Sequence, residues 1–257
     1  MKTNILKQLL FFSLICFLWS CSKKDSNEPS NNPSGNGKLH YMILSNNSTM
    51  EFLYDYSGRL ITLNWIYSGT NTKGVYSFIR NSAGQITRYS YQEPSYDFKQ
   101  TYDYSINNGG KYISAIISEV NGGNTSNSSE AYTYTGNQLK IDQSQSGHLV
   151  STTVVTYDSR GNVSKKEQYD ASGSLDSKTE STFDTTANPA GSLGAPIPIS
   201  YGNIFATNNF LSSKTTNQSS IETITASYSY DNSGKPISAI FTGYVDGGTM
   251  FIQYKYY

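Results

Sequence analysis

Apolar and polar side chains alternate along most of this chain. At residues 224–230 the even positions are apolar or aromatic, whereas the odd positions carry hydroxyl groups. A period of two places the two kinds of side chain on opposite faces of a β-strand, with one face buried and the other wet. Because no segment after the first 20 residues shows helical periodicity, the pattern predicts an all-β protein.

Glycines recur with a period close to 26 residues. Gly58, Gly84, Gly110, Gly136 and Gly161 are spaced by 26, 26, 26 and 25 residues, and the pattern resumes at Gly234; we call these six the repeat glycines. Each period contains a second turn near its middle. Two strands of about nine residues and two turns of about four fill such a period, so one repeat is predicted to be one β-hairpin.

These hairpins predict a long antiparallel meander of about 14–16 strands. A flat open sheet of that length would leave one apolar face in water. We therefore expect a single sheet that twists and curls.

A short polar residue stands three positions before most of the repeat glycines, as in Asp55, Asn107 and Asp231. Such side chains accept hydrogen bonds from the next backbone amides, and glycine supplies a positive φ, so turn formation explains the pattern. A column of calcium-binding carboxylates is the alternative. The uncharged Asn81 and Thr133 in the same column disfavour it.

The segment Tyr54-Asp55-Tyr56-Ser57-Gly58-Arg59-Leu60 resembles the YD repeat of RHS-type proteins, and weaker copies begin at Tyr157, Tyr169 and Tyr230. The chain is similar to the single-domain, YD-like lipoproteins of the Bacteroidota, whose role is mostly unassigned. The resemblance implies a repeat architecture. RHS repeats are reputed to bind carbohydrate, so it also implies a glycan as a possible ligand.

The first 20 residues have the layout of an export signal. Lys2 and Lys7 are followed by an apolar run over residues 9–19, which only Ser13 interrupts. A helix of that length spans roughly 16 Å, about half of a bilayer core. We therefore expect residues 1–20 to be a signal peptide and not a membrane-spanning helix.

The sequence Leu18-Trp19-Ser20-Cys21 resembles the bacterial lipobox, in which the cysteine becomes the acylated N-terminus. We expect Cys21 to carry the lipid, because several acyl chains anchor a protein stably whereas one is marginal. The alternative is a secreted protein with an incidental cysteine. Residues 21–38 contain almost no apolar side chain and should form a disordered tether. The start of this tether resembles outer-membrane lipoproteins of the Bacteroidota, so a periplasmic or a surface-exposed position is expected.

Residues 39–257 should form the hairpin domain, with a proline-rich insertion at about 188–217. Pro189, Pro196 and Pro198 exclude a regular strand in the first half of the insertion. Its apolar content favours a plug over one end of the sheet. A binding loop is the alternative.

Composition excludes several functions. The 19 basic and 19 acidic residues balance, and no basic patch predicts nucleic-acid binding. His40 and His148 lack metal spacing, and the sequence has neither a nucleophile elbow nor a phosphate loop. The acids are scattered, unlike the opposed carboxylates of glycosidases. We expect no enzymatic activity, no cofactor and no metal.

Tyrosine is the over-represented side chain, with 22 copies, many in same-face pairs. Such pairs are typical of an aromatic core. Tyrosine also suits a partly wet face, because each buried phenol needs a hydrogen-bond partner, and aromatic faces can stack on sugar rings. The candidate ligand-binding residues are Trp65, Tyr67, Tyr89 and Tyr91, expected on an exposed platform.

These features favour a non-enzymatic, lipid-anchored binding module of the cell envelope, whose partner would be a polysaccharide. The alternative is a structural or envelope-assembly protein that binds other proteins through its sheet face or edge.

Overall fold

The computed structural model describes residues 37–69, 73–191, 205–244 and 248–257. The predicted signal peptide, Cys21 and nearly all of the predicted tether therefore lie outside the described residues. The strands are β1 (Leu39–Leu44), β2 (Thr49–Tyr54), β3 (Leu60–Ile66), β4 (Lys73–Arg80), β5 (Ile86–Glu93), β6 (Phe98–Ile106), β7 (Tyr112–Asn121), β8 (Asn124–Thr135), β9 (Gln138–Gln145), β10 (His148–Tyr157), β11 (Val163–Asp170), β12 (Leu175–Ala187), β13 (Asn208–Asn217), β14 (Ile221–Tyr230), β15 (Pro236–Tyr244) and β16 (Gly248–Tyr256). A short 3₁₀ helix, η1 (Pro94–Tyr96), joins β5 to β6. Within the described ranges no helix is long and apolar enough to cross a membrane.

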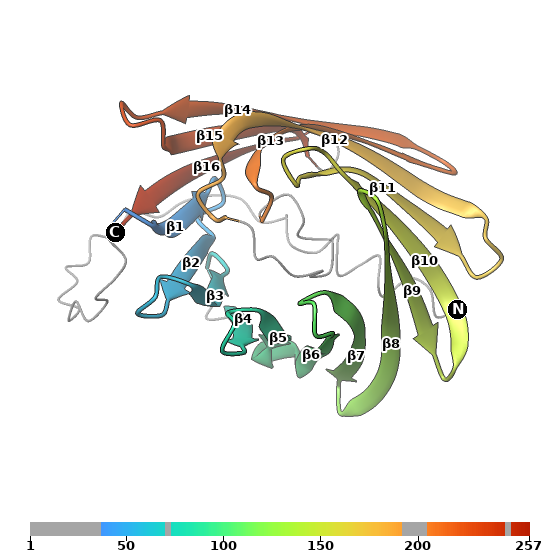
Figure 1. Ribbon diagram of the computed structural model, residues 1–257. Coiled ribbons are helices and arrows are strands. Elements are labelled where there is room, and N and C mark those ends of the chain that lie inside the picture. Colours follow the sequence, from blue (N-terminus) through green and yellow to red (C-terminus); the bar gives the residue numbers. More distant parts are fainter. Residues whose placement is uncertain (1–36, 70–72, 192–204, 245–247) are drawn as a thin grey trace.

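The strands form one antiparallel meander in which each strand pairs with its neighbours in the sequence. The prediction of hairpin repeats is thus confirmed, but the prediction of an open sheet is wrong. The first and last strands pair with each other, for example Met42 opposite Tyr254, and close a 16-stranded barrel (Figure 1). Closure leaves no unpaired strand edge exposed to other chains.

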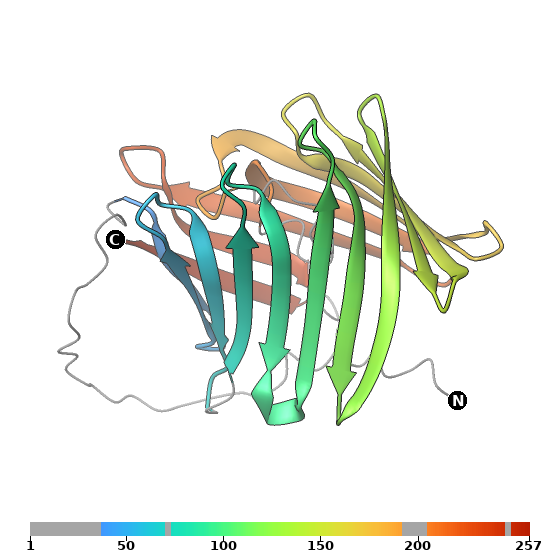
Figure 2. The same cartoon turned by 60° about the horizontal axis from the view of Figure 1, so that its bottom comes forward.

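The barrel is formed by a sheet that folds over itself. In Figure 2 the strands β3 to β8 run side by side in front, and β12 to β16 run across them behind. The apolar residues of both layers therefore face a common interior, where the main core cluster contains residues from β1 to β10, β15 and β16.

The repeat glycines hold the hairpin turns as predicted. Each has a positive φ, for example 70° at Gly58 and 85° at Gly161. In the first turn the Asp55 carboxylate accepts hydrogen bonds from the amides of Ser57 and Arg59, both at 2.9 Å. Asn107, Asp158 and Asp231 make the same pair of bonds in their turns.

The insertion is shorter than the sequence suggested. Residues 208–217 form β13, which pairs with β12 and β14, so an interruption over the whole of 188–217 is wrong. Residues 192–204 lie outside the described ranges. Ala190 and Phe205 on either side of them pack against the main core, and the Phe205 ring lies 6.4 Å from that of Phe78 in β4. The described flanks of the insertion therefore reach into the barrel interior.

Candidate binding site

The inner wall of the barrel has two chemically different parts. The apolar wall is the inner face of β1 to β7, β15 and β16, and the polar wall is the inner face of β10 to β13. Strand register decides which residues belong to each wall, because alternate side chains point to opposite faces. Strands β8, β9 and β14 connect the two walls.

Aromatic rings form a ladder across the apolar wall. Tyr76 lies opposite Tyr91, and Phe78 lies opposite Tyr89, which in turn faces Tyr102. The rings of Tyr76 and Tyr91 are stacked with centroids 4.5 Å apart. The tyrosine-rich face is therefore core at these positions.

The four aromatic residues chosen from the sequence all lie in this wall. Tyr89 and Tyr91 are only 1% and 8% exposed, so the expectation that they form an exposed platform is wrong. Trp65 and Tyr67 are half-buried near the end of β3, and their rings stack at 5.7 Å. Gly74 lies opposite Trp65, where a β-carbon would meet the Tyr91 ring at 3.0 Å. Because glycine has no side chain, Gly74 leaves room for the Tyr91 ring.

Two carboxylates accept hydrogen bonds from buried tyrosine hydroxyl groups of the inner wall. Tyr91 donates a hydrogen bond of 2.6 Å to Glu93, and Tyr132 donates one of 2.5 Å to Glu130. Burial, followed by hydrogen bonds to Glu93 and Tyr67, raises the pKa of Tyr91. Burial also raises the pKa of Glu130. The hydrogen bond from Tyr132 acts in the opposite direction and lowers this pKa, but its effect is smaller. These phenols are satisfied within the protein, as buried tyrosines require.

Along most of its length the polar wall carries hydroxyl, amide and ammonium groups. At one end the rings of Phe183 on β12 and Phe210 on β13 form a second buried cluster. Thr179 and Thr215 share a hydrogen bond of 3.0 Å, and Ser151 donates one of 3.1 Å to Gln143 on neighbouring β9. Residues of the polar wall such as Gln168 and Ser177 are half-buried. Since their side chains point into a closed barrel, their exposed area belongs to the interior.

Lys166 lies within the polar wall, on β11, beside a residue of the main core. It faces the fully buried Val155 on β10 and Thr179 on β12. Burial lowers the pKa of its ammonium group. The aromatic pairs in the sequence do not point to this residue. The one available signal was the succession of serine, threonine and glutamine at alternate positions of 151–181.

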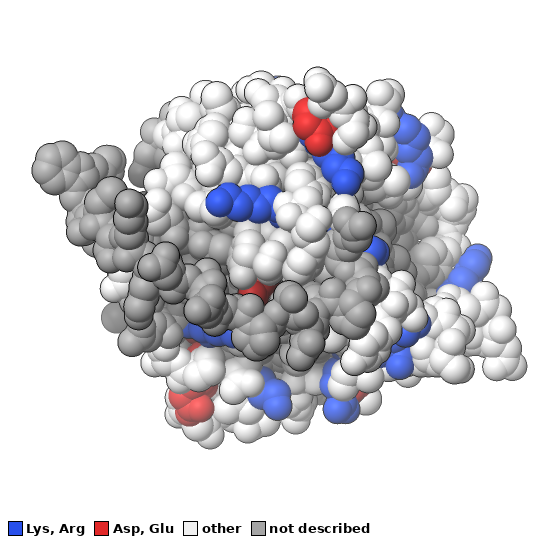
Figure 3. Space-filling view, turned by 90° about the vertical axis from the view of Figure 1, so that its left-hand side faces the viewer, with Lys and Arg blue, Asp and Glu red and all other residues white. Residues whose placement is uncertain are grey.

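The outer face of the barrel is mostly polar, although some apolar side chains such as Ile240 and Phe251 are exposed on it. Lys140 pairs with Asp142 at 2.8 Å, Lys165 with Glu167 at 2.9 Å, and Lys178 with Glu180 at 2.9 Å. On the face shown in Figure 3, charged residues of both signs are dispersed among uncharged ones. Membrane-spanning barrels have the opposite arrangement, with an apolar band outside and a polar lumen.

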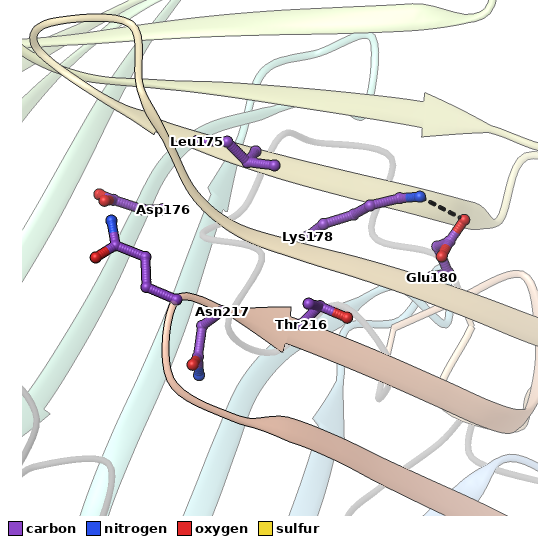
Figure 4. Close-up of a pocket in the computed structure, with 7 residues that line it drawn as sticks. Leu175, Asp176, Lys178, Glu180, Thr216 and Asn217 are labelled. Carbon is purple, nitrogen blue, oxygen red and sulfur yellow. Dashed lines mark ion pairs between the residues drawn. The ribbon is translucent and has the colours of Figure 1, made fainter.

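A shallow pocket of about 360 Å³ opens between β12 and β13. Its lining includes Leu175, Asp176 and Thr216 together with the ion-paired Lys178 and Glu180 (Figure 4). Lys178 and Glu180 neutralise each other, whereas Asp176 takes part in none of the ion pairs among the described residues.

The described residues provide no metal site. No group of three or more His, Cys, Asp or Glu side chains converges within those ranges. His40 stacks on Tyr257 at 3.9 Å, and His148 is exposed at the start of β10. The turn aspartates bond the amides of their own turns, as at Asp55.

Comparison with known proteins supports the fold. No protein-family model matches the chain, and no curated protein matches it. Among solved structures, it resembles a porin-like protein from Bacteroides vulgatus with a TM-score of 0.51 and 12% identity, over 86% of this chain and 99% of the other. A porin-like protein from Bacteroides uniformis aligns with a TM-score of 0.41 and 20% identity, over 88% and 98% of the two chains. Only the first likeness is close enough to carry an argument, and it shows that the two chains share a barrel fold.

Proposed function

We propose that this chain is a lipid-anchored, non-enzymatic binding module of the bacterial outer membrane, and that its ligand is a polysaccharide bound inside the barrel. The polar and charged outer face carries the first part of the proposal. A barrel with ion pairs such as Lys165–Glu167 and Lys178–Glu180 in its outer face is poorly suited to lipid. It would reach the membrane through acylated Cys21 and the tether.

The turns support a relationship to the YD-like lipoproteins. The Tyr-Asp segments at Asp55, Asp158 and Asp231 form turns with the same pair of backbone hydrogen bonds. This motif describes a turn that any hairpin repeat can use. It therefore supports the architecture more strongly than any particular ligand.

Replacing the anchor tests the localisation. In Cys21→Ala the acyl acceptor is missing, so the protein should incorporate no clickable fatty acid and should leave the membrane fraction. The alternative secreted form would show no label in the wild type. Undiminished labelling of the variant would overturn the assignment of Cys21.

Binding of glycan should depend on the half-buried Trp65–Tyr67 stack. Trp65→Ala should lower retention on polysaccharide affinity gels while the circular dichroism spectrum is retained. Tyr56→Ala is the matched control, because Tyr56 is 84% exposed in a turn outside the barrel. If both variants are retained like the wild type, these aromatic residues do not contact glycan.

The second candidate is an envelope-assembly protein. Binding through a free sheet edge is excluded, because the barrel is closed. A protein partner could instead contact the outer face of the barrel, where Ile240 lies opposite Phe251. The two side chains are 44% and 36% exposed. Crosslinking to envelope proteins that Ile240→Ser abolishes would favour this function.

A further inference from the structure

Lys166 differs from the other lysines in its part of the barrel. Lys140, Lys165 and Lys178 point outward and pair with carboxylates at 2.8–2.9 Å. Lys166 points inward, and no carboxylate lies within ion-pairing distance of it among the described residues. It is also the one lysine or arginine that the described parts of β8 to β14 turn inward.

Lys166 has an apolar neighbour on one adjacent strand and polar neighbours on the other, in one row of inner residues across the sheet. On one side Val155 is fully buried in the core. On the other side Thr179 bonds Thr215, and Glu222 on β14 follows in the same row. Three strand spacings of about 4.8 Å separate the backbones of Lys166 and Glu222, and the two side chains form none of the ion pairs among the described residues.

An ammonium group held inside a protein without a counter-ion is unfavourable, because burial removes water and supplies no opposite charge in return. An anionic ligand at Lys166 would supply that charge. Lysine offers a compact positive charge with three donors, which suits a carboxylate. The neighbouring hydroxyl and amide groups, among them those of Gln168 and Ser177, can exchange hydrogen bonds with sugar hydroxyl groups.

We propose that the polar wall around Lys166 binds the carboxylate of an acidic oligosaccharide, with Lys166 as the residue that selects charged over neutral sugars. This inference rests on the proposed binding of polysaccharide and adds the class of sugar. A long-chain fatty acid would also bring a carboxylate. However, the nearest inner residues on β12 and β13, which are Thr179 opposite Thr215 and Ser177 opposite Asn217, carry hydroxyl and amide groups and offer no apolar surface to an acyl chain.

Calorimetry on the full lipoprotein in detergent tests the proposal, with trigalacturonate, maltotriose and octanoate as probes. Trigalacturonate should bind the wild type, and Lys166→Met should weaken that binding about tenfold or more. Lys165→Met is the matched control, because the adjacent Lys165 faces outward and is paired with Glu167. It should change the affinity by less than about twofold.

The outcomes separate this inference from the proposed function. Preferential binding of maltotriose, or equal trigalacturonate binding by Lys166→Met and the wild type, would overturn the role of Lys166 and leave glycan binding intact. Binding of octanoate alone, or of no probe, would overturn both proposals.

A direct readout of Lys166 covers the case in which the methionine variant fails to fold. Reductive ¹³C-dimethylation of the wild type makes each lysine visible by NMR, and Lys166→Gln identifies its resonance. Trigalacturonate should shift that resonance and raise the pKa of the dimethylated Lys166, because a bound carboxylate stabilises the charged form. An unchanged titration at saturating probe would contradict the proposal.

Discussion

The apolar and polar walls of the barrel are built by the same repeat and differ almost entirely in what they turn inward. At Phe52 and Leu63 the apolar wall buries side chains that are 0% and 2% exposed. The polar wall instead presents half-buried residues such as Gln168 and Thr215. The comparison shows that turns and backbone pairing specify the hairpins, whereas the inner side chains decide which part is core and which is available to a ligand.

The width of the barrel makes this division possible. Membrane porins with sixteen strands hold a water channel, so a barrel with this number of strands need not be filled by its own side chains. Here the aromatic ladder fills one side, assisted by Phe205 against Phe78. The polar wall is therefore free of the packing that the apolar wall requires.

The largest contrast should come from truncating one residue in each wall. Phe52→Ala removes a completely buried ring and should lower the free energy of unfolding by about 3–5 kcal/mol. Thr215→Ala loses only a half-buried hydrogen bond with Thr179, so about 1 kcal/mol or less is expected. Urea denaturation measures both values, and similar losses would show that the polar wall is also core.

Asn162 tests whether hydrogen bonds, and not the burial of apolar surface, stabilise the barrel beside the polar wall. It is fully buried, donates to Asp158 and Asn208 at 2.9 Å each, and accepts from the Asn208 amide at 2.9 Å. Asn162→Ala should cost about 1–3 kcal/mol, because it leaves the buried Asn208 groups unpaired. The exposed Asn137, which donates to the Tyr157 carbonyl at 2.8 Å, provides a control in Asn137→Ala. This variant should stay within about 0.5 kcal/mol of the wild type.

The turns should behave alike next to either wall. Gly84 and Gly161 have φ values of 82° and 85° in hairpins beside the apolar and polar walls. Gly84→Val and Gly161→Val should each cost roughly 1–2 kcal/mol through left-handed backbone strain. Asparagine tolerates this conformation better, so Gly→Asn at both positions should cost less. Thermal unfolding measures both losses of stability. If the two valine variants lose unequal amounts, local packing and not backbone strain determines the cost.

The smallest effect concerns Glu130, which stands between the two walls. Its folded pKa is raised, so it contributes stability below its unfolded pKa and loses this contribution as pH rises through the folded pKa. Glu130→Gln should remove that dependence and be as stable as the wild type at pH 7, or more stable by about 1 kcal/mol or less. Glu180→Gln is a control of opposite sign, because the Lys178 hydrogen bond lowers the pKa of Glu180. Its contribution is lost as pH falls.

Local chemistry explains why the repeat could be predicted. Gly58 and Asp55 act on each other within one turn, so their spacing alone predicts the hairpin and the positive φ. The strand count was also accessible, because turn spacing limits strand length. The expected exposure of Tyr89 and Tyr91 was wrong, since a period of two does not say which face lies inside, whereas Trp65 and Tyr67 are half-buried.

By itself the sequence determined the all-β class, the meander and the turn positions, because each depends on residues close together in the chain; the anchor at Cys21 stays a prediction. Only the tertiary structure decided the closure of β1 against β16, the inward direction of the aromatic face and the isolation of Lys166. Closure depends on twist accumulated over all the strands, and burial depends on partners more than a hundred residues away, such as Phe78 and Phe205. No local pattern contains that information.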